Sequence, residues 1–299
     1  MRLRLGAVEV LAKNHTQITN WPVERPIALS VNVMYEAWAD DSAPGLGPMG
    51  NPIRSGYLDL QARSWAAYGA ESGIKRLLDI LAQKDIRATI YTSGILAERQ
   101  PAILQSMVEQ GHAVAAHGWT QDVLPIYLSR EEESAALDRC GQAILSATNI
   151  APRGYVSPRC TPSAATSALL AERGYLWHID AFDHDLPAIE VTEGGPIVAI
   201  PFTMELNDLP LAVRYGNEPQ AFTRSLERLI GRWGIARVGP ACLDLTVHAH
   251  VFGRPAGAIE FHAALALAAH SDLVWLTSHQ ELAAGALAAH TASENGEAR

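Results

Sequence analysis

Residues 74–91 read IKRLLDILAQKDIRATIY and contain a helix followed at once by a strand. Apolar residues in the first half recur at the i, i+3, i+4 and i+7 spacing of one helical face, namely Ile74, Leu77, Leu78 and Leu81. This spacing predicts a helix that ends near Lys84. The short β-rich run at 86–91 then predicts a buried strand. Together they form one unit of a βα fold.

The same alternation of helix and strand extends along most of the chain. Further strands are predicted from short β-rich runs at 27–33, 112–117, 154–157, 176–180, 197–202, 242–248 and 273–277. About eight strands in one βα succession favour a barrel over an open sheet. We therefore expect an α/β barrel domain at 27–290, an N-terminal arm at 1–26 and a flexible tail at 291–299.

Capping signals predict two more helices. Ser129 and Glu132 form an S-x-x-E capping box for a helix that reaches about Ala147. The dipeptide at 161–162, Thr-Pro, predicts a second helix, with the threonine as its N-cap and Gly174 at its end.

Composition and charge exclude several classes of protein. The 299 residues are 48% apolar and 18% charged, as in an ordinary globular protein. The net charge is −9 and the basic residues are scattered, so we expect no nucleic-acid partner. The apolar runs fall short of the roughly 20 residues that span a bilayer, so we expect no membrane span. Glu9 and Lys13 interrupt the apolar stretch near the N-terminus before it reaches the length that a secretory signal needs, so we expect no export signal. The cysteines, Cys140, Cys160 and Cys242, are too widely spaced for a disulfide framework. A cytoplasmic location is the expectation.

Polar residues cluster where the predicted strands end. In a βα barrel the carboxyl ends of the strands meet at one mouth, so these residues are candidates for a site. They are Asn32, Glu36, Thr92, Ser93, His117, Arg159, Asp183, Asp185, Asn207, Asp208, His248, His250, Ser278 and His279. A long loop at 39–51 follows the first strand and should lie at the same end. The chain contains neither a G-x-S-x-G elbow nor a Walker loop, which argues against serine acyl transfer and phosphoryl transfer.

Histidines supply the strongest signal at the mouth. His248 and His250 stand two residues apart after an apolar run, so extended geometry would place both rings on one face. They could bind a metal or divide the acid and base roles, or one of them could simply hydrogen-bond to the backbone. Alternation along 112–117 turns His112 away and His117 toward the mouth. Glu36 is either part of this site or a solvated loop residue.

The other polar candidates have structural alternatives. Asp183 and Asp185 would share a face if the segment is extended, but they could equally cap a turn. Arg159 could hold a carboxylate, carbonyl or imide oxygen, or pair with one of these aspartates. Trp38 and Trp119 stand beside mouth residues and are expected as pocket walls.

Six short stretches in order carry a family resemblance. They are SVNVMYE (30–36), AHGW (116–119), SPRCTP (157–162), DHDLP (183–187), IPFTMELND (200–208) and HAHVFGRP (248–255). From about residue 25 to 282 the chain resembles the polysaccharide deacetylase superfamily, also called the NodB-homology family. It is most similar to the branch of cofactor-independent allantoinases, cyclic imide hydrolases and peptidoglycan-deacetylase-like proteins. The resemblance implies a distorted (β/α)7-like barrel, similar to a TIM barrel, that hydrolyses a C–N bond.

The resemblance also implies a question about metal. In metal-dependent members an Asp and an H-x-x-x-H pair hold a zinc-like ion. Here Gln121 stands four residues after His117, and Asn32 and Met34 occupy the places of the family's aspartates. Either a divalent metal is held with different spacing or the site works without metal, which we slightly favour. The candidate ligands are Glu36, His117, Asp122, His248 and His250.

For the metal-free case the resemblance implies a division of roles. Glu36 or Asp183 would activate water, His248 would protonate the leaving nitrogen, and Arg159 with Asn207 would stabilise the oxyanion. The expected substrate-binding residues are Trp38, His117, Trp119, Asp185, Asp208 and His250.

Three functions follow in order of preference. The first is a hydrolase that opens a small cyclic amide, imide or ureide, as an allantoinase does. The second is a metal-dependent N-deacetylase of an acetylated sugar or peptidoglycan. The third is a catalytically degenerate protein that binds a small molecule. In all three cases the partner is a small molecule or sugar, and relatives of this type imply a homo-oligomer.

Overall fold

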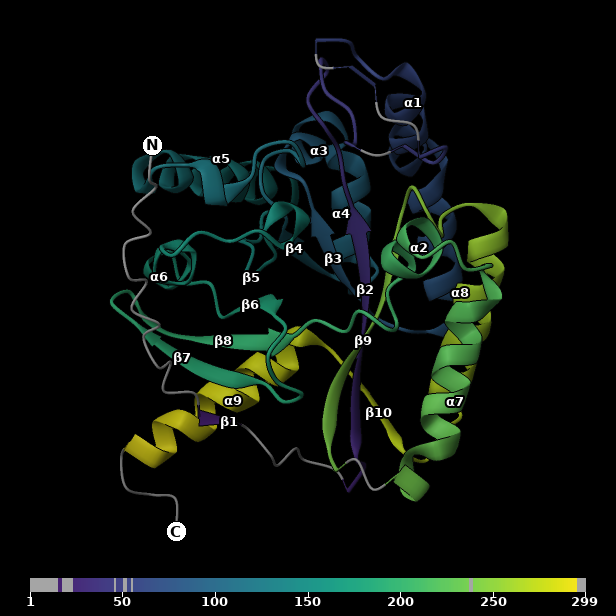
Figure 1. Cartoon of the computed structure of the whole chain (residues 1–299). Coiled ribbons are helices and arrows are strands. Elements are labelled where there is room, and N and C mark those ends of the chain that lie inside the picture. The colour runs from purple at the N-terminus through teal and green to yellow at the C-terminus, as the bar shows by residue number, and fades with distance from the viewer. Residues whose placement is uncertain are drawn as a thin grey trace, which may run out of the picture.

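A curled sheet of mainly parallel strands forms the centre of the protein (Figure 1). The computed structural model describes residues 16–17, 24–45, 47–50, 53–54, 56–236 and 239–294. The parallel strands are β2 (Ile27–Tyr35), β3 (Thr89–Thr92), β4 (Ala113–Ala116), β5 (Gly154–Tyr155), β6 (Trp177–Ala181), β8 (Gly195–Pro201), β9 (Ala241–His248) and β10 (Val274–Thr277). Their order is β8-β6-β5-β4-β3-β2-β10, and β9 also pairs with β2. All eight predicted strands are confirmed, with small shifts of their ends.

The barrel is distorted because β8 and β9, which face each other on one side, share few backbone hydrogen bonds. Between β8 and β9 the structure shows only an isolated bridge, from Asn207 to Thr246, among the residues it describes. Beside it the Thr246 N–H donates to the Leu206 carbonyl at 2.9 Å. The prediction of an α/β fold with a barrel-like sheet is confirmed, and the barrel takes the form of a curled half-barrel.

Two antiparallel strands at the edge of the sheet were absent from the sequence prediction. β7 (Ala188–Thr192) pairs antiparallel with β8, and β1 (Thr16–Gln17) pairs antiparallel with β7. The β7–β8 turn contains Gly195 at a φ of 114°, a conformation that glycine adopts without steric cost. Both strands are short and lie at the edge of the sheet, so their sequences carry little of the periodicity that reveals a buried strand.

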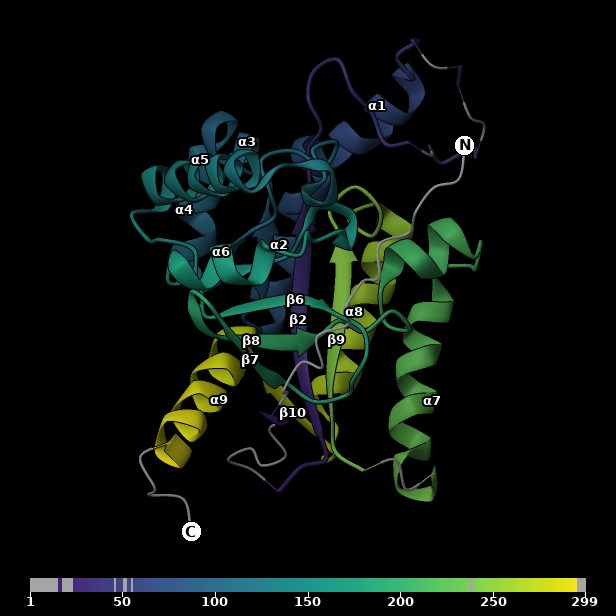
Figure 2. The same ribbon diagram turned by 60° about the vertical axis from the view of Figure 1, so that its left-hand side comes forward.

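Helices cover the outer face of the sheet, while one helix packs on the inner side (Figure 2). The helices are α1 (Leu60–Tyr68), α2 (Ile74–Lys84), α3 (Gly94–Arg99), α4 (Pro101–Glu109), α5 (Arg130–Thr148), α6 (Thr166–Glu172), α7 (Gln220–Ala236), α8 (Pro255–Ala269) and α9 (His279–Glu294). Short helical turns are η1 (Gly69–Gly73), η2 (Pro125–Tyr127), η3 (Pro158–Cys160) and η4 (Leu209–Arg214). Helix α9 contributes Leu282, Ala283 and Ala286 to the core on the inner side of the sheet.

Local signals predicted two helices correctly. Helix α2 ends at Lys84 and buries the four residues of its apolar stripe. At the start of α5 both halves of the capping box form: the Ser129 hydroxyl accepts the Glu132 N–H at 3.2 Å, and the Glu132 carboxylate accepts the Ser129 N–H at 2.8 Å. These helices depend on contacts close in sequence, which is why the sequence reveals them.

The predicted start of α6 is wrong. The dipeptide at 161–162 does not open a helix, and α6 begins at Thr166. Instead, the hydroxyls of Ser163 and Thr166 both donate to Glu133 of α5, which holds this segment as a turn. The helix ends close to Gly174, which has a φ of 74°, as expected for a residue that terminates a helix.

The ends of the chain are only partly described. Most of the predicted arm at 1–26 lies outside the described residues, and within it 16–17 form β1. The predicted tail begins too early, because α9 continues to Glu294. Residues 295–299 lie outside the described part. Among the described residues we find no helix with the length and apolar character needed to cross a membrane.

Strand β2 places the first functional side chain. Its residues alternate between the two faces of the sheet. Leu29, Val31 and Val33 pack in the core under the outer helices, whereas Met34 packs in the inner core. Glu36 follows the carboxyl end of this strand. It therefore lies at the mouth of the half-barrel, where polar residues were expected.

Candidate active site

A cavity of about 520 Å³ opens at the carboxyl ends of the strands. Its polar and charged lining residues come from the segments after five strands: Glu36, His117, Gln121, Asp122, Arg159, Asn207, Arg214, His248 and His250. Its apolar walls include Trp38, Trp65 and Phe182, and residues 43–45 of the long loop after β2 also line it. The position of this loop agrees with the expectation that it lies at the same end of the barrel as the polar strand ends.

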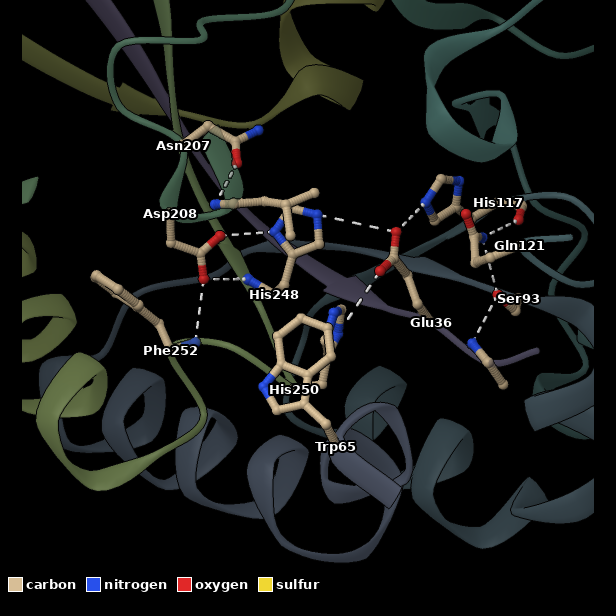
Figure 3. Close-up of polar contacts among 12 residues, drawn as sticks. Glu36, Trp65, Ser93, His117, Gln121, Asn207, Asp208, His248, His250 and Phe252 are labelled. Atoms are coloured by element: carbon tan, nitrogen blue, oxygen red, sulfur yellow. Dashed lines mark hydrogen bonds and ion pairs between the residues drawn. The ribbon is translucent and has the colours of Figure 1, made fainter. Parts of the chain in front are cut away.

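Glu36 lies at the centre of a histidine cluster (Figure 3). Its Oε1 is 3.0 Å from Nε2 of His117 and 3.8 Å from Nε2 of His248. Its Oε2 is 3.6 Å from Nδ1 of His250. All four side chains are buried. The sequence placed these residues on three strand ends, and the fold brings them within contact of one carboxylate.

The cluster tunes the ionisation of its members. Burial alone would raise the pKa of Glu36, but the nearby His248, His117 and His250 outweigh it and lower this pKa to about 2. Burial lowers the pKa of His250 to about 4, with only partial compensation from Glu36. At neutral pH the cluster therefore contains an ionised carboxylate beside a neutral His250.

His248 is held by a buried aspartate. Its Nδ1 donates to Oδ1 of Asp208 at 2.6 Å, and Oδ2 of Asp208 accepts the backbone N–H of His248 at 2.8 Å and of Phe252 at 3.1 Å. These bonds fix the imidazole so that Nε2 faces Glu36 and the cavity. Burial would lower the pKa of His248, but Asp208 and Glu36 together raise it. His248 can therefore carry a proton near neutral pH and donate it from Nε2.

His117 is oriented from its other side. The Val156 carbonyl can only accept, so Nδ1 of His117 donates to it at 3.0 Å and directs Nε2 at Glu36. His112 behaves as predicted for a structural residue, since its Nδ1 accepts the Ala88 N–H at 3.1 Å.

His250 reaches the cluster by a different geometry from the one predicted. Strand β9 ends at His248, and a turn follows in which the Ala249 N–H donates to the Met34 carbonyl at 2.9 Å. The His250 ring packs edge-on against Trp38 and Trp65, at centroid distances of 5.6 and 4.6 Å. The two histidines share the site because of this turn, although extended strand geometry does not persist.

Asn207 and Arg159 present hydrogen-bond donors to the cavity. Oδ1 of Asn207 accepts the Leu209 N–H at 3.0 Å, which leaves its amide NH₂ for a ligand. Arg159 and Cys160 both have left-handed backbone conformations, with φ of 56° and 53°. Ser157, two residues before Arg159, is anchored through its backbone N–H and hydroxyl to the half-buried Asp180.

Four expected site residues lie outside the cavity lining. The Asp183 side chain is 71% exposed and contacts His184 at 2.5 Å. Asp185 is exposed, and its carbonyl accepts the Cys242 N–H at 2.8 Å. Trp119 packs under the Arg139 guanidinium, 3.5 Å from the ring centroid. The segment after β6 bends instead of continuing as a strand, so the extended geometry that would place these aspartates on one face is absent. Asp208 also lies behind the cavity wall, where it supports His248.

Sequence reasoning missed several cavity residues. Trp65 in α1, Phe182 and Arg214 line the cavity, and none of them was predicted to do so. Arg214 ends the π-helical turn η4, and π-helical turns frequently occur at functional sites. No local sequence signal marks these residues as neighbours of the mouth.

The possible metal ligands of the cavity are not arranged as a zinc site. Among the described residues, no group of three His, Cys, Asp or Glu side chains is arranged to hold a metal ion. Gln121 stands at the place of the family's second histidine, and its amide nitrogen donates to the Ser93 hydroxyl at 3.1 Å and the His117 carbonyl at 3.0 Å. The Asp122 carboxylate accepts the Ala39 N–H at 2.9 Å. Both side chains are thus engaged in holding the loops of the site.

Comparison with known proteins identifies proteins of similar sequence and fold. Residues 67–177 match the family model described as polysaccharide deacetylase. A peptidoglycan deacetylase of Helicobacter pylori is 25% identical over 63% of this chain and 74% of its own length.

Solved structures extend the similarity over nearly the whole chain. A structure of PuuE allantoinase has a TM-score of 0.80 at 26% identity and covers 90% of this chain and 93% of its own. A probable polysaccharide deacetylase from Pseudomonas aeruginosa has a TM-score of 0.78 at 25% identity, with 88% and 92% covered. These similarities to polysaccharide deacetylases and to an allantoinase support a hydrolase that acts on carbon–nitrogen bonds.

Proposed function

We propose that the protein opens a small cyclic amide, imide or ureide by hydrolysis. The observation that carries this proposal is the cavity of about 520 Å³, which has the Glu36–histidine cluster on its wall and residues 43–45 of the loop after β2 at its side. Such a volume is typical of small-molecule sites of about 300–1,000 Å³. The aromatic walls suit a flat ring. The similarity to a structure of PuuE allantoinase supports the same assignment.

The reaction needs a water molecule held against a carbonyl carbon. Glu36 accepts a hydrogen bond from this water and orients it. Because a carboxylate with a pKa near 2 is a weak base, Glu36 takes the proton only as the new C–O bond forms. His117, through its bond to Glu36, fixes the direction of the carboxylate.

The ring nitrogen leaves as the C–N bond breaks. His248 donates the proton from Nε2 to this nitrogen, and Asp208 stabilises the imidazolium before transfer. The free amide of Asn207 stabilises the charge on the carbonyl oxygen. The products are an open chain with a carboxylate at one end and, at the other, an amine from a cyclic amide, an amide from an imide or a urea group from a ureide.

Deacetylation of an acetylated sugar is the second candidate. It is supported by the family model and by the relative described as a peptidoglycan deacetylase. The same residues could in principle hydrolyse an acetamide, which is a poorer electrophile with a poorer leaving group. A divalent metal would polarise the carbonyl and acidify its bound water. Since the described donor set does not fit such an ion, we assign no step to it.

The experiment that separates the candidates is an activity panel with and without prior chelation. Proton release or acetate release is measured with cyclic imides, cyclic ureides and N-acetylated sugars. Ring opening that survives chelation supports the proposal. Acetate release that chelation abolishes and zinc restores would favour the deacetylase. Tight binding of an intact ring without turnover would identify a protein that binds a small molecule but has lost catalysis.

A further inference from the structure

Two arginines line the cavity without an acidic partner. Neither Arg159 nor Arg214 forms an ion pair or side-chain hydrogen bond with any residue in the described part of the chain. By contrast, the arginines Arg99, Arg130, Arg173 and Arg224 all pair with carboxylates on the surface.

The acidic groups of the cavity are already engaged. Glu36 contacts three histidines, and Asp122 accepts the Ala39 N–H at 2.9 Å. Neither carboxylate forms an ion pair with Arg159 or Arg214 in the described structure. Both arginines line the cavity and are exposed, so their donors are available to a ligand.

Irregular backbone places both arginines there. Arg159 stands in a left-handed conformation with a φ of 56°, which is costly for any residue that has a Cβ, and half-buried hydrogen bonds from Ser157 to Asp180 hold the turn. Arg214 stands at the end of the π-helical turn η4, and Leu209, Pro210 and Val213 of the same turn also line the cavity. Two separate irregular segments thus converge on one cavity with one positive side chain each.

Arg214 also affects the ionisation of His248. The positive charge of Arg214 lowers the pKa of His248, so this charge lies within electrostatic reach of the imidazole ring. An anionic group bound to Arg214 would therefore remove a repulsion on the protonated His248. A neutral ligand would leave that repulsion in place.

We propose that the substrate carries a carboxylate substituent, remote from the scissile C–N bond, which Arg214 and Arg159 bind. The inference rests on the proposed function and narrows its substrate class from neutral rings to acidic cyclic imides and ureides. The planar forks of arginine match a carboxylate in two-point hydrogen bonds, which gives selectivity as well as affinity. The chemistry is unchanged: water adds to the ring carbonyl, the C–N bond breaks, and His248 protonates the nitrogen.

The test compares two rings that differ only in this charge. Hydantoin-5-acetate and hydantoin-5-acetamide are assayed as substrates with the wild type, with Arg214→Gln and with the control Arg224→Gln. Arg224 is a surface arginine of α7 paired with Glu218. We expect kcat/KM for the acid to exceed that for the amide by about tenfold, as for a charge-assisted pair, and this ratio to fall toward one in Arg214→Gln but not in the control. Added salt should lower the ratio.

Calorimetric binding of the same two compounds makes the result independent of turnover. If neither ring is hydrolysed, the proposed function fails, and the ratio of the two dissociation constants still decides this inference. If both rings are hydrolysed with equal kcat/KM, the function stands and the inference is overturned. A wild-type preference that Arg214→Gln leaves unchanged would overturn the assignment to this residue.

Discussion

Among single residues, Asp208 controls the proton that the reaction needs. Its carboxylate helps to raise the pKa of His248, so the protonated imidazole persists to higher pH. Because His248 acts as an acid, activity should fall as pH rises through this pKa. In Asp208→Asn the charge is lost, and we expect the alkaline limb of kcat/KM to move down by about one pH unit or more. A pH–rate profile measures this, and an unmoved limb would exclude the assigned role.

His250 should make the fold sensitive to acid. Its pKa falls from 6.5 to about 4 on folding, so between these values the unfolded chain binds the proton more tightly. Stability from this group is present above pH 6.5 and is lost as pH falls toward 4. Between pH 7 and 5 the wild type should lose about 2 kcal/mol more unfolding free energy than His250→Leu. Urea unfolding at both pH values tests this.

A parallel loss in the two proteins would show that His250 is not buried in its neutral form. The titration of Glu36 does not affect the comparison of the wild type with His250→Leu between pH 7 and 5. Its pKa is lowered from 4.5 to about 2, so its contribution to stability is lost only below about pH 4.5.

Among the secondary-structure elements, η1 sets the position of the turn that carries His250. A Cβ on Gly73 would lie 1.8 Å from the Ala249 carbonyl oxygen, a backbone atom that cannot give way alone. We expect Gly73→Ala to displace this turn, to lower the unfolding free energy by about 1–3 kcal/mol and to reduce kcat/KM.

Gly231→Ala is the matched control for this change. Gly231 lies inside α7 with open space where a Cβ would be, so alanine should leave activity unchanged and slightly raise stability. Equal effects of the two substitutions, measured by thermal unfolding and kcat/KM, would mean that the close approach of η1 to the turn is unimportant.

The elements also show what the sequence could and could not reveal. Helix α2 and the capping box of α5 follow from residues within one or two turns, and both were predicted. The start of α6 depends on Glu133, thirty or more positions earlier, so the local N-cap signal was misleading. Likewise, alternation placed His117 and His248 at the mouth, but only the tertiary fold places Asp208 behind His248 and Trp65 against His250.

For the molecule as a whole, a buried polar chain connects the inner face of the sheet to α9. The Trp177 indole donates to the Tyr91 hydroxyl at 2.8 Å, and this hydroxyl donates to Nδ1 of His279 at 2.7 Å. Nε2 of His279 then donates to the Asp244 carboxylate at 2.7 Å. His279 and Asp244 are fully buried, and none of the four residues lines the cavity.

Removal of His279 should therefore affect stability rather than catalysis. His279→Ala leaves the Asp244 carboxylate and the Tyr91 hydroxyl with one partner fewer in the core, and such losses cost about 1–3 kcal/mol each. We expect a lower thermal midpoint and a kcat for the remaining folded protein close to that of the wild type. A large loss of kcat at unchanged stability would instead connect this chain to the active site.

The central claim is that Glu36 and His248 hydrolyse the C–N bond of a small ring. The most direct test is the rate of ring opening, followed by NMR of a cyclic imide or ureide, in the wild type, Glu36→Gln and His248→Ala. General acid–base catalysis of this kind contributes about 10²–10⁴-fold, so each variant should lose at least a hundredfold in kcat/KM while remaining folded. Ring opening at the wild-type rate in either variant would contradict the account.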